Sequence, residues 1–156
     1  MTFNSLVIGS GSIGERHAKN LVNSFNQNVY VLTRNPDKKF RDPFLNSSNR
    51  VSRISYEEID RINNFESVII ATPSSIRSNA INSIKNSKIG FIYVEVPAAI
   101  SFSEWVLLKE KASQLSTELY AGYNMRFHPG YQKLNLLKKS NFVSFRGIFA
   151  EYLPAL

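Results

Sequence analysis

A glycine-rich stretch near the N-terminus places the strongest constraint on the fold. Gly9, Gly11 and Gly14 have the spacing G-x-G-x-x-G, between an apolar run at residues 6–8 and a segment with helical character at residues 15–22. Strand, tight turn and helix in this order are typical of a dinucleotide-binding unit. Gly9 would permit the turn, Gly11 would admit a pyrophosphate close to the backbone, and Gly14 would let the helix pack against the strand. Free N–H groups at the helix N-terminus would face the anion.

Strand-like and helical segments alternate as far as residue 123. We expect strands at residues 28–33, 51–55, 66–71, 90–96 and 118–123. We expect helices at residues 56–62, around Ala80, Ile81 and Ile84, and after a capping box formed by Ser101 and Glu104. Residues 36–50 are predicted to be a loop with one short helical turn. This alternation predicts an α/β fold, a Rossmann-type doubly wound parallel sheet with helices on both faces.

The end of the second expected strand bears on the choice of cofactor. An NAD-binding fold usually places Asp or Glu about 20 residues past the glycines. This chain has Thr33, Arg34 and Asn35 there. The guanidinium of Arg34 could bind a 2′-phosphate, and Thr33 could donate its hydroxyl. The sequence therefore predicts NADP, with NAD as the second choice; the alternative is that Arg34 is a solvated residue before Pro36.

Polar residues also follow the fourth expected strand. Thr72, Pro73 and Ser74 come directly after an apolar run. In a parallel sheet this position lies at the carboxyl edge, where cofactors bind. Thr72 and Ser74 could contact the cofactor or cap the next helix, and the sequence does not choose between these roles.

Composition narrows the classes of function. The 156 residues include no cysteine, which excludes disulfides and thiolate metal sites, and we expect no metal and a cytoplasmic location. No apolar run approaches the roughly 20 residues of a membrane span, and we expect no membrane segment. The net charge is +7, with a loose basic cluster at Lys38, Lys39, Arg41, Arg50 and Arg53. Because no helical face carries a basic stripe, we expect attraction of a phosphorylated cofactor or acidic metabolite and no nucleic-acid binding.

The regular alternation of strand-like and helical segments ends after residue 123. Residues 1–123 are predicted to be the dinucleotide-binding Rossmann domain, and residues 124–156 the start of an incomplete, truncated C-terminal domain for substrate binding or oligomerisation. A polar-aromatic turn at 124–129, an amphipathic helix at 130–139 and a strand at 142–153 are expected there. An unpaired strand invites pairing, which predicts a homo-oligomer or a partner chain at residues 142–153.

Four segments, at residues 7–17, 71–74, 95–97 and 122–129, together resemble the Gfo/Idh/MocA oxidoreductases, relatives of glucose–fructose oxidoreductase and inositol dehydrogenase. The resemblance covers essentially the whole chain. It implies NAD(P)-dependent hydride transfer to or from a sugar, sugar derivative or cyclitol. Together with the residues inferred above, the expected cofactor-binding set is Gly9, Gly11, Ser12, Ile13, Gly14, Thr33, Arg34, Thr72, Pro73, Glu95, Pro97 and Asn124.

The chain also departs from the family pattern. The family usually has Glu-Lys-Pro after strand five, and its lysine supports proton transfer; here that position is Val96, which has no titratable proton. Arg77 stands where a histidine is often found. The family's catalytic Asp and His would lie beyond Leu156, and we expect His17 and His128 to be structural. We therefore expect no catalytic residue and little independent activity; the alternative is a non-catalytic nucleotide-binding or scaffold protein that pairs with a partner chain.

Overall fold

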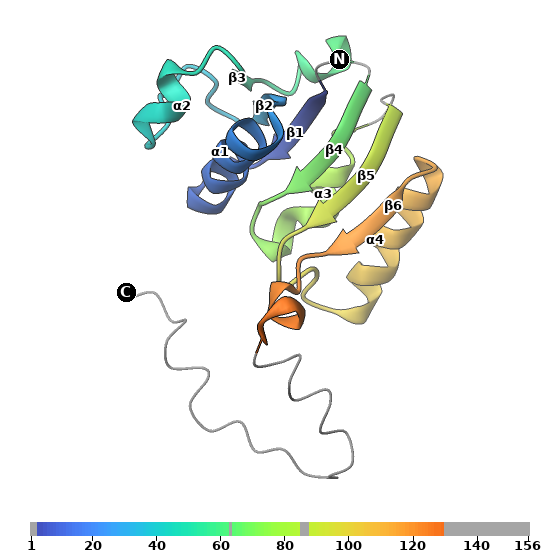
Figure 1. Cartoon of the computed structure of the whole chain (residues 1–156). Coiled ribbons are helices and arrows are strands. Elements are labelled where there is room, and N and C mark those ends of the chain that lie inside the picture. The colour runs from blue at the N-terminus through green and yellow to red at the C-terminus, as the bar shows by residue number, and fades with distance from the viewer. Residues whose placement is uncertain (1–2, 63, 85–87, 130–156) are drawn as a thin grey trace. The chain divides into compact units, whose positions relative to one another are not determined.

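A six-stranded parallel sheet forms the centre of the computed structural model, which describes residues 3–62, 64–84 and 88–129 (Figure 1). The chain divides into two compact units, Met1–Gly122 and Tyr123–Leu156. The strands in the first unit are β1 (Asn4–Ile8), β2 (Asn28–Leu32), β3 (Val51–Ile54), β4 (Asn64–Ile70), β5 (Lys88–Val94) and β6 (Glu118–Ala121). Their order is β3-β2-β1-β4-β5-β6, with every neighbouring pair parallel. This is the strand order of a Rossmann fold, which confirms the predicted fold class.

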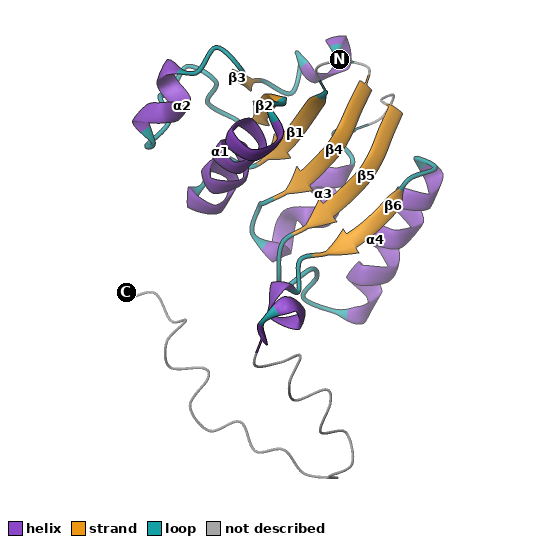
Figure 2. Cartoon of the chain, viewed as in Figure 1, coloured by secondary structure: helices purple, strands orange, loops and turns teal. Residues whose placement is uncertain are grey.

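Helices lie on both faces of the sheet (Figure 2). The α-helices are α1 (Ser12–Phe25), α2 (Pro43–Ser47), α3 (Arg77–Ile81) and α4 (Phe102–Gln114). Short 3₁₀ turns are η1 (Ile59–Arg61), η2 (Ser74–Ile76) and, in the second unit, η3 (Asn124–Phe127). Figure 1 shows α1 on one face and α3 and α4 on the other. Among the described residues, no helix is long and apolar enough to cross a bilayer.

The core is divided into two layers by the sheet. On the α1 side, Ala18 and Leu21 pack with strand residues such as Val31. On the other side, Ile81 of α3 and Leu108 of α4 pack against the opposite faces of the strands. Residues 67–70 of β4 are all buried, as expected of a strand covered on both faces.

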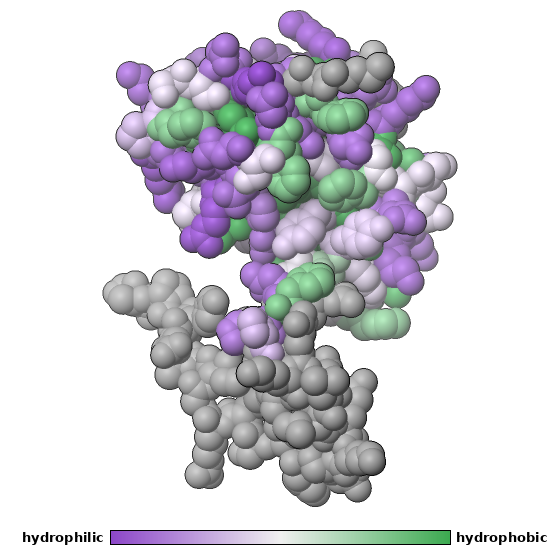
Figure 3. All heavy atoms as spheres, in the orientation of Figure 1, coloured by the Kyte–Doolittle hydropathy of each residue, from purple (hydrophilic) through white to green (hydrophobic). Residues whose placement is uncertain are grey.

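Part of the α1 side of the sheet stays open. Phe91 of β5 and Tyr120 of β6 are exposed there, and their rings meet edge-on at 6.0 Å. Figure 3 shows hydrophobic and weakly polar side chains over β5 and β6, framed by hydrophilic ones.

The segment 56–62 is where the element prediction is wrong. Only the short turn η1 forms there, instead of a helix with three residues on one face. Ile59 is buried, whereas Tyr56 is 45% exposed, so the segment buries too little apolar surface to support a longer amphipathic helix. The carboxylate of Glu58 accepts a hydrogen bond of 2.7 Å from the Ser55 backbone N–H, which favours a tight turn.

Other local expectations are met. The predicted helical turn within residues 36–50 is α2, capped by Asp42. Ala80, Ile81 and Ile84 are buried as expected. At the start of α4, the Ser101 hydroxyl accepts a hydrogen bond from the Glu104 N–H, as a capping box predicts. The Glu104 carboxylate accepts from the Ile100 N–H, and the capping box predicts the Ser101 N–H as its donor. The expected helix at 130–139 and strand at 142–153 lie outside the described residues.

Candidate cofactor site

The glycine turn joins β1 to α1 with little room for other side chains. Gly9 has φ of +112°, a conformation that favours glycine, and its N–H bonds to the Leu32 carbonyl at 3.1 Å. A Cβ at Gly9 would lie 3.0 Å from the Ala71 carbonyl oxygen, and a Cβ at Gly14 would lie 2.0 Å from the Gly9 carbonyl oxygen. Both glycines are therefore required by the backbone itself, as the spacing predicts.

Gly11 has different surroundings. It is the N-cap of α1, with φ of −77° and ψ of 179°, and a Cβ there would meet no atom within 4 Å. No side chain caps the N-terminus of this 14-residue helix, and the first two residues, Ser12 and Ile13, are exposed. The N–H groups of the first helical turn have no partner within the helix. Open space over a positive helix end suits a phosphate or pyrophosphate.

Thr72 adds a second sign of a ligand beside the glycine turn. This residue follows β4 and is buried, and its Oγ1 has no hydrogen-bond partner in the described part of the chain. Its Cγ2 would lie 3.3 Å from a Cβ at Gly9. Neither η2 nor α3 has a side-chain cap, so the capping role considered for Thr72 and Ser74 is not seen. An unpaired buried hydroxyl is costly, and a bound polar ligand would satisfy it.

A polar cavity of about 260 Å³ opens beside the glycine turn, at the ends of β2 and β3. Its lining consists of Ser10, Gly11, Glu15, Thr33, Asn35, Lys38, Lys39, Arg41 and Arg53. The Thr33 and Ser10 hydroxyls are 3.0 Å apart, so Thr33 connects the turn to the end of β2. Arg34 is exposed and does not line this cavity, whereas four other cationic side chains do.

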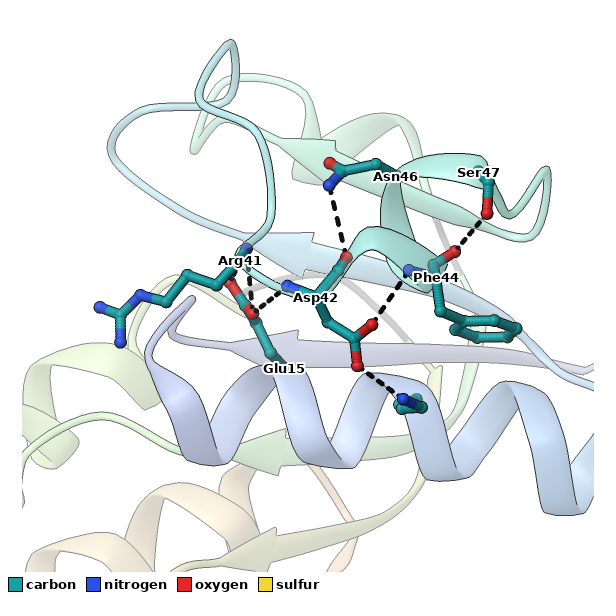
Figure 4. Close-up of polar contacts among 7 residues, drawn as sticks. Glu15, Arg41, Asp42, Phe44, Asn46 and Ser47 are labelled. Carbon is teal, nitrogen blue, oxygen red and sulfur yellow. Dashed lines mark hydrogen bonds and ion pairs between the residues drawn. The ribbon is translucent and has the colours of Figure 1, made fainter.

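The loop that carries Lys38, Lys39 and Arg41 is attached to α1 (Figure 4). Both oxygens of the buried Glu15 carboxylate accept the Arg41 N–H, at 3.1 and 3.2 Å, and one also accepts the Asp42 N–H at 3.2 Å. Asp42 caps α2 by accepting from the Phe44 N–H at 3.0 Å and receives Lys19 Nζ at 2.7 Å. The hydrogen bond from Lys19 lowers the pKa of Asp42, and the one from Phe44 adds to this.

Arg53 fixes the loop from the other side. Its guanidinium lies 4.6 Å from the centre of the Phe40 ring and donates to the carbonyls of Asn35, at 3.1 Å, and Lys38. Burial lowers the pKa of Arg53, and the charge of Glu15 opposes this shift. Three of the four cations, Lys38, Lys39 and Arg41, are thus carried by a loop that Glu15 and Arg53 hold in place.

The end of β5 is held from two directions. His17 Nε2 of α1 lies 2.6 Å from Glu95 Oε1, and the His17 ring packs edge-on against Tyr93 with centroids 5.6 Å apart. The buried Arg77 guanidinium donates to the carbonyls of Thr72, at 2.9 Å, Glu95 and Pro97. These contacts are compatible with the expectation that His17 is structural, which stays a prediction, and its partner Glu95 was not predicted.

The basic cluster expected to attract a phosphorylated cofactor supplies Lys38, Lys39, Arg41 and Arg53 to the lining of this cavity, and its role toward a cofactor stays a prediction. The contacts of Arg77 with three backbone carbonyls were not predicted, and no sequence pattern points to them. Pro73 and Pro97 are exposed beside the ends of β4 and β5. Asn124 belongs to the second unit, and its assignment to the cofactor stays a prediction. The described residues contain no cluster of three or more metal-ligating side chains.

Comparisons with known proteins identify the family and the fold of this chain. The model of the Gfo/Idh/MocA family, described as an oxidoreductase family with an NAD-binding Rossmann fold, matches residues 3–123. The chain is similar to the scyllo-inositol 2-dehydrogenase (NAD(+)) of Bacillus subtilis (strain 168), at 31% identity over 128 residues. That alignment covers 80% of this chain and 36% of the relative.

Two solved structures show the same fold. The UDP-N-acetylglucosamine 3-dehydrogenase GnnA from Acidithiobacillus ferrooxidans aligns with a TM-score of 0.68 and 20% identity, over 90% of this chain and 43% of that one. The myo-inositol 2-dehydrogenase from Lactobacillus plantarum aligns with a TM-score of 0.67 and 17% identity, over 88% of this chain and 41% of that one. The chain therefore spans less than half the length of these relatives.

Proposed function

The chain belongs to the Gfo/Idh/MocA oxidoreductase family, with its NAD-binding Rossmann fold, and from that premise we propose that it binds NADP(H) for hydride transfer involving a sugar, sugar derivative or cyclitol. The substrate class rests on the inositol dehydrogenase relative and on the sequence resemblance. The proposal that the chain binds this cofactor rests on one observation: open space at Gly11 occurs together with a buried Thr72 hydroxyl that has no partner in the described part of the chain. Gly11 and Thr72 follow the carboxyl ends of β1 and β4, the two neighbouring strands at which the strand order reverses and dinucleotides bind.

Each part of the site has a distinct task in this proposal. The N-terminus of α1 would hold the pyrophosphate, with Gly11 leaving room for it. Thr72 Oγ1 would bond to the cofactor, and the segment from Glu95 to Pro97 would border the nicotinamide side. The bound nicotinamide supplies the hydride chemistry.

The cavity beside β2 favours the phosphorylated cofactor. Lys38, Lys39 and Arg41 bring positive charge to the place where the adenosine ribose of a bound dinucleotide is expected. Glu15 also lines the cavity, but its carboxylate is engaged by the Arg41 and Asp42 N–H groups. A phosphate monoester is the ligand that such a cationic loop recognises best. The relative's printed cofactor is NAD(+), so this preference is proposed for this chain on its own residues.

The chemical step has less support within this chain. Val96 lies between Glu95 and Pro97 and cannot donate or accept a proton. Losing a positioned acid or base commonly costs about 10²–10⁴-fold in rate. We propose that residues 1–123 form the cofactor domain and that residues 124–156 begin a substrate domain, with Asn124 near the cofactor and little turnover by these residues alone. Val96 equally supports the alternative of a non-catalytic nucleotide-binding protein.

Titration with NADPH and NADH, followed by nicotinamide fluorescence, tests the cofactor. We expect tighter binding of NADPH. Lys38→Ala/Lys39→Ala should weaken NADPH about tenfold and leave NADH nearly unchanged, because only NADPH carries the 2′-phosphate. Lys88→Ala/Lys109→Ala removes the same charge away from the cavity and is the matched control.

Arg34→Ala distinguishes Arg34 from the Lys38/Lys39 pair as the group that binds the 2′-phosphate. If Arg34→Ala loses NADPH affinity and Lys38→Ala/Lys39→Ala does not, Arg34 binds the phosphate, as the sequence suggested. Tighter binding of NADH than of NADPH would contradict the NADP proposal. Hydride transfer from NADPH to an inositol-type ketone, measured for this chain, would separate a working enzyme from the non-catalytic alternative.

A further inference from the structure

The contact between His17 and Glu95 crosses the point where the strand order reverses. His17 lies on α1, which connects β1 to β2, whereas Glu95 directly follows β5. The two residues are 78 positions apart in the sequence, yet His17 Nε2 and Glu95 Oε1 are 2.6 Å apart. A dinucleotide bound at such a reversal contacts both halves of the sheet. This pair therefore connects the half that carries the glycine turn to the half that borders the nicotinamide side.

The surroundings give Glu95 one orientation. Its Oε1 faces His17, and its Oε2 accepts the Val96 N–H at 3.2 Å. Its carbonyl oxygen accepts from the buried Arg77 guanidinium, which also bonds to the carbonyls of Thr72 and Pro97. The His17 and Glu95 side chains are each 21% exposed, so water screens their contact only in part.

The charge of Glu95 acts on two neighbouring titratable groups, Tyr93 and Arg77. The charge of Glu95 raises the pKa of Tyr93 in addition to the larger effect of burial, so Tyr93 stays neutral beside the pair. Burial lowers the pKa of Arg77, and the charge of Glu95 counteracts this. Both carboxylate oxygens of Glu95 have protein partners, which suits a residue that orients the backbone more than one that binds the cofactor directly.

We propose that His17 and Glu95 are positioning residues that couple the two halves of the dinucleotide site. Their contact sets the separation between the glycine turn and the segment from Glu95 to Pro97. The inference rests on the proposed function, because it assigns the pair to the same cofactor. It predicts that breaking the contact weakens a ligand that spans both halves and spares a ligand that occupies one.

The test compares NADPH with adenosine 2′,5′-bisphosphate, which carries only the adenosine half. His17→Ala should weaken NADPH about tenfold, as for the loss of a charge-assisted hydrogen bond, and change the affinity for the bisphosphate less than about twofold. His17→Gln, which keeps an N–H donor, should recover most of the affinity for NADPH. Circular dichroism checks that each variant is folded, and His17→Phe, which keeps a ring against Tyr93 and removes both ring nitrogens, serves if His17→Ala does not fold.

A double-variant cycle separates coupling from unrelated damage. His17→Ala/Glu95→Ala should lose no more NADPH affinity than the weaker-binding of the two single variants, His17→Ala and Glu95→Ala, because each single change already breaks the His17–Glu95 contact. Additive losses, equal weakening of both ligands, or unchanged NADPH binding by His17→Ala would each overturn the positioning role. If the unaltered chain binds neither ligand, the proposed function itself fails, and this inference fails with it.

Discussion

Gly14 and Gly11 belong to one turn, but an added methyl group would have opposite consequences at the two positions. At Gly14 the new Cβ would lie 2.0 Å from the Gly9 carbonyl oxygen, a backbone atom that cannot move without opening the turn. We expect Gly14→Ala to lower the free energy of unfolding by about 3 kcal/mol, despite the better helix propensity of alanine. Urea unfolding followed by circular dichroism measures this loss.

Gly11→Ala is the matched substitution in the same turn. The new Cβ would meet no protein atom within 4 Å, and φ of −77° is accessible to alanine. We expect a change in unfolding free energy of about 1 kcal/mol at most, together with a clear loss of NADPH affinity because the methyl group occupies the ligand's space. Unchanged NADPH affinity in a folded Gly11→Ala variant would contradict the placement of the pyrophosphate.

Thr33 and Arg34 show how far single residues could be read from the sequence. Their position after β2 was predicted from the distance to the glycines, and the structure places both there. Their contacts depend on the fold: Thr33 bonds to Ser10, whereas Arg34 is exposed outside the cavity. Lys38 and Lys39 line the cavity on a loop that Glu15 and Arg53 bond to from distant positions in the chain, and a linear sequence pattern does not contain those long-range bonds.

Helix α2 and the middle of α1 are joined by one ion pair, which makes their contact sensitive to pH. Hydrogen bonds from Lys19 and Phe44 lower the pKa of Asp42 in the folded state. The ion pair therefore contributes stability above the unfolded pKa of about 4 and loses it as the pH falls through the lower folded value. We expect Asp42→Asn to be less stable than the unaltered chain at pH 7.

The difference in stability should shrink progressively as the pH falls below about 4, because Asp42 is then protonated first in the unfolded chain and, as the pH falls through its lower folded pKa, in the folded chain as well. Asp60→Asn removes the same charge from η1 and is the control. Urea unfolding at pH 7, 5 and 3 measures the difference. A deficit of Asp42→Asn that is equal at all three pH values would show that helix capping alone, without the charge of Asp42, accounts for the effect.

The elements themselves were predictable where apolar burial decides the conformation. Residues 67–70 are buried on both faces and were expected as strand from their continuous apolar character. The conformation of the segment 56–62 was not predictable in this way. The spacing of its apolar residues resembles that of a helix, but a hydrogen bond from the Ser55 N–H to the Glu58 side chain closes a short turn instead. The periodicity of apolar residues identifies which face of a helix would be buried. It does not show whether enough of the rest of the protein lies nearby to bury that face.

At the scale of the whole molecule, positive charge and backbone dipoles act on different parts of the same proposed ligand. The net charge is +7, and four of the cationic side chains line the cavity beside β2. The pyrophosphate is instead expected at the uncapped N-terminus of α1, where N–H groups make direct hydrogen bonds. Salt screens exposed charges far more than short hydrogen bonds in a partly buried turn.

This difference predicts how salt should change cofactor preference. Raising NaCl from about 0.1 M to about 1 M shortens the screening length from roughly 10 Å to 3 Å, and we expect the ratio of NADPH to NADH affinity to fall about fivefold. In Lys38→Ala/Lys39→Ala the ratio should be lower at the outset and respond less to salt. Fluorescence titrations of both cofactors at each salt concentration measure the ratio. A preference for NADPH that salt leaves unchanged would mean that neutral hydrogen bonds, such as those available from Ser10 and Asn35, discriminate between the cofactors in place of the lysines.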